Sequence, residues 1–190
     1  MVRNPERRTT LLNAAIDVLA AQGARGLTFR AVDTAADVPV GTTSNYFPNR
    51  DELLRQAGEH VFVRLTPDDT TTAALLDDDR DRDHERRLMQ DLLRRAEADR
   101  AGYLAMFELR LEAVRRPELR AAFTRGFRAN LEQIVQTHVD GGFPGNRTTA
   151  VLLYVAMSGL LLEHLTLPGV LGEEHIDEVV AALVETIVPG

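Results

Sequence analysis

Hydrophobic residues recur every three or four positions along most of the chain, which is the spacing of one face of an α-helix. Val, Ile and Thr nowhere alternate with polar residues over the length of a strand. We therefore expect an all-α protein. The pattern predicts a short helix directly after Thr28. It also predicts helices at residues 5–22, 40–47, 51–65, 84–99, 102–115, 118–139, 147–165 and 174–188.

Capping residues divide the first third of the chain into separate helices. Gly23 is a natural end for the first helix, and Thr28 is placed to cap the second. Asn49 followed by Glu52 has the spacing of a capping box at the start of the fourth helix. We predict a three-helix domain at residues 1–50 and a larger helical domain at residues 51–190, which begins with a connecting helix at residues 51–65.

Residues 66–83 break the helical pattern. This stretch is rich in Asp and Thr and has no stable apolar face. We predict a mobile loop here, with no binding role.

The last two helices carry more hydrophobic surface than a single helix can hide. The final helix has one apolar stripe, and the helix before it is apolar nearly all round. Full burial within a monomer would explain this pattern, but we favour a homodimer. The predicted interface consists of Leu160, Leu161, Ile176, Val179, Val180, Leu183, Val184 and Ile187.

Composition narrows the class of protein further. The 190 residues carry a net charge of −7 and include no cysteine, which excludes disulfides and thiolate metal sites. Residues 1–50 have a charge of +2 and the remainder −9, as in a nucleic-acid-binding module joined to a different module. The polar N-terminus lacks the apolar core of a signal peptide, and the apolar run at residues 151–162 is too short to span a bilayer. We expect a cytoplasmic protein.

The motifs of common enzymes do not occur in this sequence. The five histidines lack the spacing of a zinc or di-iron site, and there is no P-loop, dinucleotide-binding glycine pattern or nucleophile elbow. Glu108 and Glu112 are spaced as paired carboxylates could be, but neighbouring arginines favour a solvated charged face. We predict no catalytic residues, no metal and no cofactor.

Polar side chains crowd into residues 42–46, "TTSNY", directly after a Val-Pro-Val-Gly break. Two short helices joined by a tight turn, the second with exposed polar side chains, are typical of a helix-turn-helix. In that motif the second helix enters the major groove, where hydroxyl and amide groups meet phosphates and base edges. The pattern therefore favours DNA binding.

The stretch "GARGLTFRAVDTAADVPVGTTSNYFPNRDELL" resembles the DNA-binding domain of the TetR family of bacterial transcriptional regulators, over about residues 7–56. The resemblance lies in Leu27-Thr28, Val38, Gly41-Thr42, Tyr46-Phe47 and residues 50–54, "RDELL". The chain departs from the family at Asp37, where Gly is usual, and at Pro39, Thr43-Ser44 and Pro48.

The resemblance implies a homodimeric regulator that binds duplex DNA, with a helical body that binds an effector. Carried over position by position, it assigns DNA contacts to Thr28, Arg30, Val40, Gly41, Thr42, Ser44, Asn45, Tyr46 and Arg50, with Arg50 on a phosphate. Family motifs do not extend into the body, so its cavity is predicted from the residues themselves. Candidate ligand-binding residues are Leu92, Tyr103, Met106, Phe107, Arg110, Phe123, Phe127, Tyr154, Met157 and Leu161.

The leading hypothesis is a repressor that a small hydrophobic ligand releases from a palindromic operator. A regulator without a small-molecule inducer is an alternative that the sequence does not separate from it. An all-α carrier or enzyme with a borrowed DNA-binding head would need a polar cluster in the body, which the sequence lacks.

Overall fold

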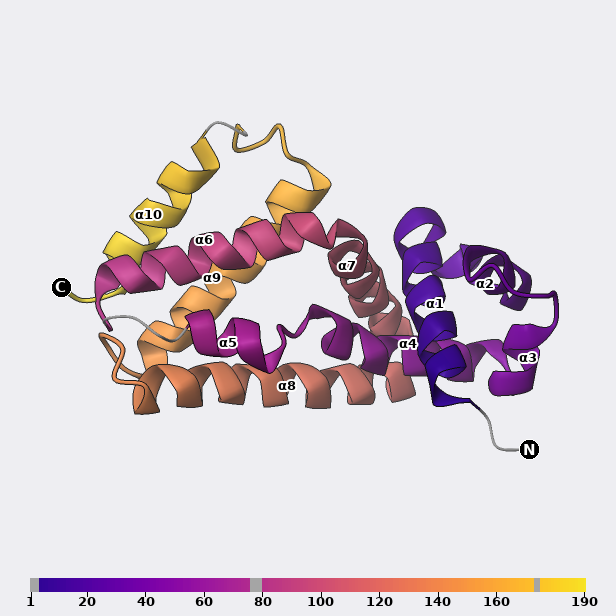
Figure 1. Ribbon diagram of the computed structural model, residues 1–190. Helices are drawn as coiled ribbons and strands as arrows, with labels where there is room; N and C mark the ends of the chain where they lie inside the picture. Colours follow the sequence, from indigo (N-terminus) through magenta and orange to yellow (C-terminus); the bar gives the residue numbers. More distant parts are fainter. Residues whose placement is uncertain (1–3, 76–79, 173–174) are drawn as a thin grey trace. The chain divides into compact units, whose positions relative to one another are not determined.

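The computed structural model describes residues 4–75, 80–172 and 175–190, except for the side chains of Asp69, Ala74 and Leu75. Throughout these residues the chain forms helices joined by turns, without strands, as the hydrophobic spacing predicts (Figure 1). The chain divides into two compact units. Unit 1 comprises residues 1–66 and 99–126, and unit 2 comprises residues 67–98 and 127–190.

This division differs from the predicted boundary at residue 50. Unit 1 contains α1 (Pro5–Gly26), α2 (Phe29–Ala35), α3 (Thr42–Tyr46), α4 (Arg50–Leu65), α7 (Arg100–Arg115) and the beginning of α8 (Pro117–Asp140). Because α1 packs against α7 as well as against α2 and α4, a helix distant in sequence joins the N-terminal helices. The fully buried core of the unit includes Leu11, Ile16, Leu19, Leu27, Val32, Phe47, Leu53, Leu54, Val61 and Leu109.

The end of α1 is built around Gly23. The residue has φ 67°, so regular helix geometry stops there as predicted, although one further turn continues to Gly26. Beside the break, Glu108 of α7 accepts a hydrogen bond from the backbone N–H of Ala24 at 2.7 Å. A Cβ at position 23 would lie 3.1 Å from that carboxylate, so glycine serves both the backbone angle and the close approach of α7.

Two glycines bring α4 close to the first part of α8. A Cβ on Gly58 would lie 2.6 Å from the Phe123 ring, and one on Gly126 would lie 2.6 Å from the Phe62 ring. The two rings meet edge to face with centroids 5.5 Å apart. Any larger residue at either glycine must therefore displace an aromatic ring of the unit 1 core.

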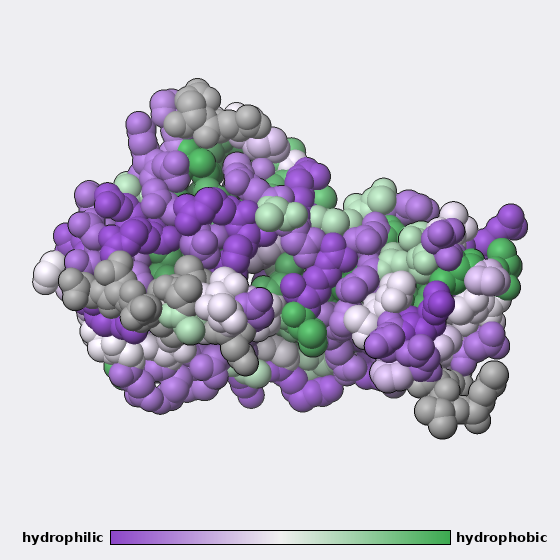
Figure 2. All heavy atoms as spheres, viewed as in Figure 1, coloured by the Kyte–Doolittle hydropathy of each residue, from purple (hydrophilic) through white to green (hydrophobic). Residues whose placement is uncertain are grey.

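Unit 2 contains α5 (Asp69–Leu75), α6 (Arg82–Ala98), α9 (Arg147–Thr166), α10 (Ile176–Ile187) and the remainder of α8. Helices α6, α9 and α10 pack on one another. The outer face of α6 is mostly hydrophilic (Figure 2), whereas its half-buried Met89 and Leu92 pack against buried residues of α9 and α10.

Four residues of the predicted dimer interface lie instead in the core of their own unit. Val180 packs with Met157 and Leu160, and Val184 packs with Leu153 and Val188. Leu161 is also buried. The apolar stripe of the last helix is real, but much of it is covered by α6 and α9 of the same chain. Helical periodicity shows that a face is buried without showing what covers it.

A buried polar pair joins α6 to the end of α8. Nδ1 of His138 lies 2.7 Å from Oε1 of Glu85, and both side chains are almost completely buried. Nε2 of the same imidazole lies 3.1 Å from the carbonyl oxygen of Pro144, and Phe143 stacks on the ring. Burial raises the pKa of the Glu85 carboxyl, while the adjacent His138 acts in the opposite direction.

The loop predicted at residues 66–83 is wrong in part, because α5 lies within it. Asp68 accepts a hydrogen bond from the N–H of Thr71 at 2.7 Å, and this contact starts the short helix. Residues 76–79 of the predicted loop lie outside the described residues. Helix α6 begins at Arg82, two residues before the predicted start, and Asp81 accepts from the N–H of His84 at 2.7 Å.

Helix α9 has 20 residues, more than the apolar run at residues 151–162 indicated, and by length and composition alone it could cross a membrane. A core helix of a globular unit passes the same test. Here α9 packs against α6 and α10, and its Ala150, Leu153, Met157, Leu160 and Leu165 are buried. These contacts account for the apolar residues on one face of α9, while Leu152, Val155 and Leu162 are exposed.

Candidate nucleic-acid interface

A buried carboxylate on α2 holds the beginning of α3. Asp33 is 1% exposed, and its Oδ2 accepts from the N–H of Gly41 at 2.7 Å. Its Oδ1 accepts from the N–H of Thr43 at 2.7 Å and from the Thr43 hydroxyl at 2.5 Å. One side chain thus satisfies two of the unpaired N–H groups at the start of α3 and fixes the orientation of the two helices.

Asp33 is a functional residue outside the set predicted from the sequence. The signal available was a carboxylate one residue after Val32, which belongs to the apolar face of a seven-residue helix. Asp33 hydrogen-bonds to Gly41 and Thr43 at the start of α3, so it acts by positioning that helix.

The turn between α2 and α3 uses an aspartate in the left-handed region. Asp37 has φ 50°, a backbone angle at which Gly is the ordinary residue. Its N–H donates to the carbonyl of Thr34 at 3.2 Å, and the N–H of Val38 donates to that of Asp33 at 3.0 Å. The departure from the family at this position therefore retains the tight turn, because Asp tolerates the left-handed region better than most residues.

Several of the polar side chains in residues 42–46 hydrogen-bond within the motif. The Thr42 hydroxyl donates to the carbonyl of Pro39 at 2.6 Å, and the Ser44 hydroxyl donates to that of Gly41 at 2.7 Å. Thr43 is fully buried on Asp33, so it does not belong to the group of exposed polar residues that the sequence suggested. Thr42 and Ser44 keep lone pairs that can accept hydrogen bonds, and their orientation is fixed by the backbone.

The predicted DNA contacts occupy the surface of these helices to different degrees. Thr28 caps α2 by accepting from the N–H of Ala31 at 3.1 Å, as predicted. The exposed members of the set are Thr28, Arg30, Val40, Ser44 and Asn45, and the half-buried members are Gly41, Thr42, Tyr46 and Arg50. The side chains that face solvent come from the two ends of the motif, α2 with its cap and α3 with the turn before it.

Arg50 differs from the expectation of a side chain extended toward a phosphate. Its Nε donates to the carbonyl of Leu27 at 2.8 Å, and its Nη2 donates to the carbonyl of Ala24. These carbonyls lie at the end of α1, so Arg50 ties the first residue of α4 to the connection between α1 and α2. The phosphate contact stays a prediction, and it has to coexist with this bracing role.

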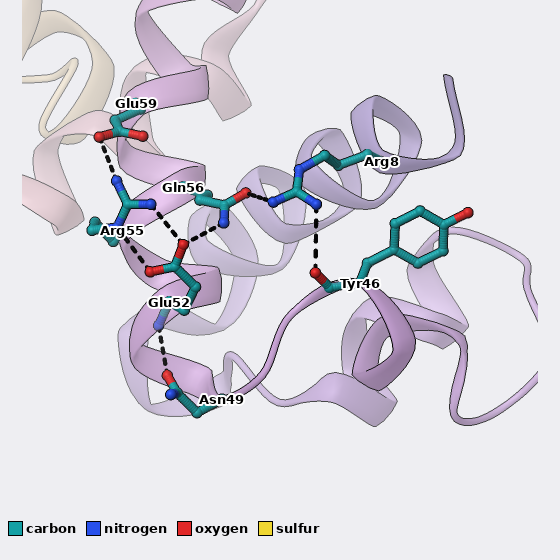
Figure 3. A network of polar contacts seen from close by, with 7 residues as sticks. All are labelled: Arg8, Tyr46, Asn49, Glu52, Arg55, Gln56 and Glu59. Carbon is teal, nitrogen blue, oxygen red and sulfur yellow. Dashed lines mark hydrogen bonds and ion pairs between the residues drawn. The ribbon is translucent and has the colours of Figure 1, made fainter. Parts of the chain in front are cut away.

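A chain of polar contacts links the end of α3 to α4 (Figure 3). Arg8 of α1 donates to the carbonyl of Tyr46 at 3.5 Å and to the side chain of Gln56, and its guanidinium lies 5.0 Å from the centroid of the Phe47 ring. The phenol ring of Tyr46 points away from these contacts, which hold the backbone of the residue (Figure 3).

The capping box predicted at α4 is half correct. Asn49 accepts from the N–H of Glu52 at 2.8 Å, as expected (Figure 3). The Glu52 carboxylate instead accepts from Arg55 at 2.6 Å and from Gln56 at 2.5 Å. Hydrogen bonds from Arg55 and then Gln56 lower the pKa of Glu52 to about 2, so this carboxylate is charged at neutral pH.

The predicted ligand-binding residues are distributed over both units. In unit 1, Tyr103 and Phe123 are buried, Met106 and Phe107 are half-buried, and Arg110 is exposed. In unit 2, Met157 and Leu161 are buried, Leu92 packs against Met157 and its neighbours, and Phe127 and Tyr154 are half-buried.

The two carboxylates that the sequence presented as a pair have separate partners. Glu108 holds the end of α1, while Glu112 accepts from Arg115 at 2.6 Å and Arg116 at 3.0 Å. Within the part of the chain that the structure describes, no group of three His, Cys, Asp or Glu side chains could hold a metal ion.

A helix-turn-helix with a carboxylate-anchored second helix, attached to an all-helical body, defines a DNA-binding transcriptional regulator. Comparison with protein families agrees with this class. Residues 11–57 match the family described as bacterial regulatory proteins, tetR family, and residues 80–190 match the Tetracyclin repressor-like C-terminal domain. The chain belongs to the tetR family of bacterial regulators, which are generally not enzymes.

Solved structures of related proteins share the fold over the full chain. The multidrug binding protein EbrR complexed with imidazole is 30% identical, with 98% of this chain and 97% of that chain covered and a TM-score of 0.62. A TetR family member from Streptomyces coelicolor A3 is 28% identical, with 98% and 100% covered and a TM-score of 0.66. A transcriptional regulator from Rhodococcus sp. Rha1, at 22% identity, covers 97% and 96% with a TM-score of 0.71. A comparison with curated protein sequences gives no match.

Proposed function

We propose that this protein is a homodimeric repressor that binds a palindromic operator and is released by a small hydrophobic ligand. The observation that carries the DNA part is the anchoring of α3 by Asp33. A five-residue helix has almost no stability alone, and here a buried carboxylate fixes it while Ser44 and Asn45 stay exposed. A rigid helix with exposed hydroxyl and amide groups suits a major groove.

Binding to DNA is tested by gel-shift titration against a library of duplexes at low salt. We expect selection of a site with two half-sites related by a dyad, because a twofold dimer presents two copies of α3 about 34–36 Å apart. Affinity should fall steeply as salt rises, since phosphate contacts release counterions. If the protein binds no duplex at low salt, the proposal is wrong.

Substitution of Asn45 tests whether the protein recognises DNA bases as well as the phosphate backbone. Asn45→Ala should change the preference among operator variants by about 1–3 kcal/mol at one base pair if its amide reads an adenine. Arg30→Ala should weaken all duplexes alike and flatten the salt dependence by about one unit, as expected for a lost phosphate contact. Equal losses on every sequence for both variants would show that Asn45 reads no base.

The dimer is proposed to form through the outer face of α9. Leu152, Val155 and Leu162 are 49%, 59% and 44% exposed, although they belong to the most apolar helix of the chain. Together with Gly159, these residues follow the i, i+3, i+7, i+10 spacing of one helix face. An added Cβ at Gly159 would meet no atom within 4 Å, so this face is open at that position too. A second copy of the chain would cover this stripe, which differs from the residues predicted from sequence.

Val155→Glu tests this interface. The variant should fold, because residue 155 is exposed, but it should sediment as a monomer and lose operator affinity. Val170→Glu is the matched control, since Val170 is 63% exposed and lies outside α9. If the Val155 variant still sediments as a dimer, the α9 stripe is not the interface.

Release by a ligand is supported by the nature of the relatives. EbrR is described as a multidrug binding protein and was solved with ethidium at 30% identity and with proflavin at 31% identity to this chain. The body of the present chain also carries half-buried aromatic residues in each unit, including Phe107 in unit 1 and Tyr154 in unit 2. A ligand would release DNA only by binding the released form better than the operator-bound form.

Ethidium and proflavin are therefore the first compounds to test, by thermal shift without DNA and by release of a labelled operator. A coupling of about 1–3 kcal/mol would lower operator affinity roughly 5- to 150-fold. Tyr154→Ala and Phe127→Ala should weaken release, while Val170→Ala should not. Since both compounds bind DNA, release must also be measured against an unrelated protein–DNA complex. If neither they nor a metabolite panel stabilises the protein, the regulator without an inducer becomes the better description.

A further inference from the structure

One cavity of unit 1 is unusually positive for a chain with a net charge of −7. It has a volume of about 400 Å³ and is lined by Ala24, Arg25, Arg50, Glu112, Arg115 and Arg116. Four arginines face one glutamate there, so the lining carries three positive charges in excess. We call this cavity the arginine cleft. None of its residues belongs to the predicted ligand-binding set.

The positive charge of the arginine cleft is only partly balanced by carboxylates. Glu112 binds Arg115 and Arg116, and Asp51 binds Arg116 at 2.6 Å. Hydrogen bonds from Arg115 lower the pKa of Glu112, so this carboxylate is ionised at neutral pH. Two carboxylates thus serve two of the four arginines.

The other two arginines have no such partner. Among the residues that the structure describes, no carboxylate lies within ion-pairing distance of Arg25 or Arg50. Arg50 donates to two carbonyl oxygens, which are neutral, and Arg25 is exposed. The nearby Glu108 accepts from the N–H of Ala24. An anion entering the cleft would therefore meet positive charge that no carboxylate of the described chain neutralises.

We propose that the arginine cleft binds a phosphate group. The planar guanidinium offers paired N–H donors that match phosphate oxygens, and several such groups around one cavity favour a phosphate over a simple halide. Such a phosphate can come from the backbone of bound DNA or from a free phosphorylated molecule. The DNA source rests on the proposed function and would extend the DNA-binding surface to the end of α7.

The position of the cleft within unit 1 supports a link to DNA. Arg25 lies three residues before Thr28, which caps α2, and Arg50 is the first residue of α4. Both residues border the helix-turn-helix in sequence, and Arg50 hydrogen-bonds to Leu27 beside Thr28. A phosphate in the arginine cleft would touch the connection from α1 to α2 and the end of α7 together.

The test uses the full chain with Arg25→Gln and Arg115→Gln combined. Arg115 is 66% exposed and pairs only with Glu112 three residues away, so its loss should not unfold the protein. Arg94→Gln is the matched control, because Arg94 is 65% exposed and pairs with Asp91 three residues away. Circular dichroism and Tm without added anion verify that all three proteins are folded. Arg50 is left unchanged because it braces α1.

The first arm measures Tm as sodium pyrophosphate is added at an ionic strength held constant with NaCl. Wild type and Arg94→Gln should be stabilised over the same concentration range. The double variant should need at least about tenfold more pyrophosphate for the same rise in Tm. The loss of one charge-assisted hydrogen bond already lowers affinity by that factor.

The second arm measures the salt dependence of duplex binding for the same three proteins. If backbone phosphates occupy the cleft, the double variant should bind every duplex more weakly, with a slope shallower by about two units. A shallower salt dependence in the double variant identifies DNA as the source of the phosphate. If only the response to pyrophosphate changes, the source is a free phosphorylated molecule. If the double variant matches wild type in both arms, the inference is wrong. If wild type binds no duplex, the proposed function fails, while the pyrophosphate arm still decides the cleft.

Discussion

Helices α3 and α10 are held in place by opposite kinds of interaction. Helix α3 has five residues, of which Thr43 is buried, and its first N–H groups are bound by the Asp33 carboxylate. Helix α10 has twelve residues, and it is held by Val180 and Val184 in the apolar core of unit 2. Its cap, His175, makes no side-chain hydrogen bond to the helix end.

The difference follows from what each helix must expose. A helix that offers polar side chains to DNA has little apolar surface to bury, so burial at about 25 cal/mol per Å² cannot hold it. A side chain that hydrogen-bonds to the backbone of the helix can hold it in place. A helix that contributes to a core is stabilised by the buried area itself and needs no cap. Polar anchoring also fixes orientation, because hydrogen bonds are directional and apolar contacts are not.

The largest effect should come from placing a charge where α10 is held. Val180→Glu would bury a carboxylate in the hydrophobic cluster of Met157 and Leu160, and we expect a loss of more than about 4 kcal/mol, enough to unfold unit 2. Thr186→Glu, on the exposed face of the same helix, should change stability by less than about 0.5 kcal/mol. Circular dichroism with urea titration measures both. A stable Val180→Glu protein would mean that apolar burial does not hold α10.

Glu85 tests whether unit 2 also depends on a polar anchor. Both ring nitrogens of His138 face oxygen atoms, so Glu85 and His138 together must hold a proton between them. Glu85→Ala leaves Nδ1 of the buried imidazole without its partner and should cost about 3–5 kcal/mol.

Glu85→Gln is the matched variant. Its amide can donate to Nδ1 while Nε2–H donates to Pro144, so the loss should be only about 1–2 kcal/mol. Urea denaturation at pH 7 compares the two. Equal losses for Ala and Gln would show that side-chain volume is not decisive and that the amide does not replace the carboxyl group beside Nδ1.

Asp33→Ala should loosen α3 while leaving α10 intact. It leaves the N–H groups of Gly41 and Thr43 unsatisfied, so we expect the free energy of unfolding to fall by about 2–4 kcal/mol. Operator binding should be lost as well. Asp33→Asn keeps one acceptor and should lie between Ala and wild type. Hydrogen exchange of the α3 amides, with α10 amides as the internal reference, measures the effect. Unchanged exchange in α3 would remove the carboxylate from this role.

Asp37→Gly should have the smallest effect and the opposite sign. The φ of 50° strains a non-glycine residue, and glycine relieves this strain. Glycine also raises the conformational entropy of the unfolded chain, which opposes the gain. We expect a net stabilisation of about 0.5–1 kcal/mol. Asp17→Gly, in the middle of α1, should destabilise by about 1 kcal/mol or more, because it adds glycine to a helix and removes the ion pair of Asp17 with Arg64. Thermal denaturation distinguishes them. A destabilised Asp37→Gly would show that the aspartate side chain contributes to the turn.

Local features were predicted correctly because local sequence decides them. Thr28 caps α2, Asn49 caps α4 and Gly23 ends the regular part of α1, since each acts on backbone groups within a few residues. The helix in residues 66–83 was missed because seven residues give too few turns to show a period, and its cap at Asp68 lies in a run of acidic residues.

The partners of side chains distant in sequence could not be predicted. Arg50 was expected on a phosphate and donates to the carbonyls of Ala24 and Leu27, because only the folded chain brings those oxygens to α4. Val180 and Val184 were assigned to a dimer and lie in the core of their own unit. A periodic apolar stripe has the same sequence whether its own chain or a second copy covers it.

The sequence by itself determined the helices other than α5, the helix-turn-helix and its polar surface, because spacing and capping act over one or two turns. Only the tertiary structure decided that Asp33 anchors α3, that Glu85 meets His138, and that Arg25 and Arg50 share a cleft with Arg115 and Arg116. Those contacts join residues from 8 to 91 positions apart, and their geometry is set by the packing of whole helices. Short-range patterns carry no information about it.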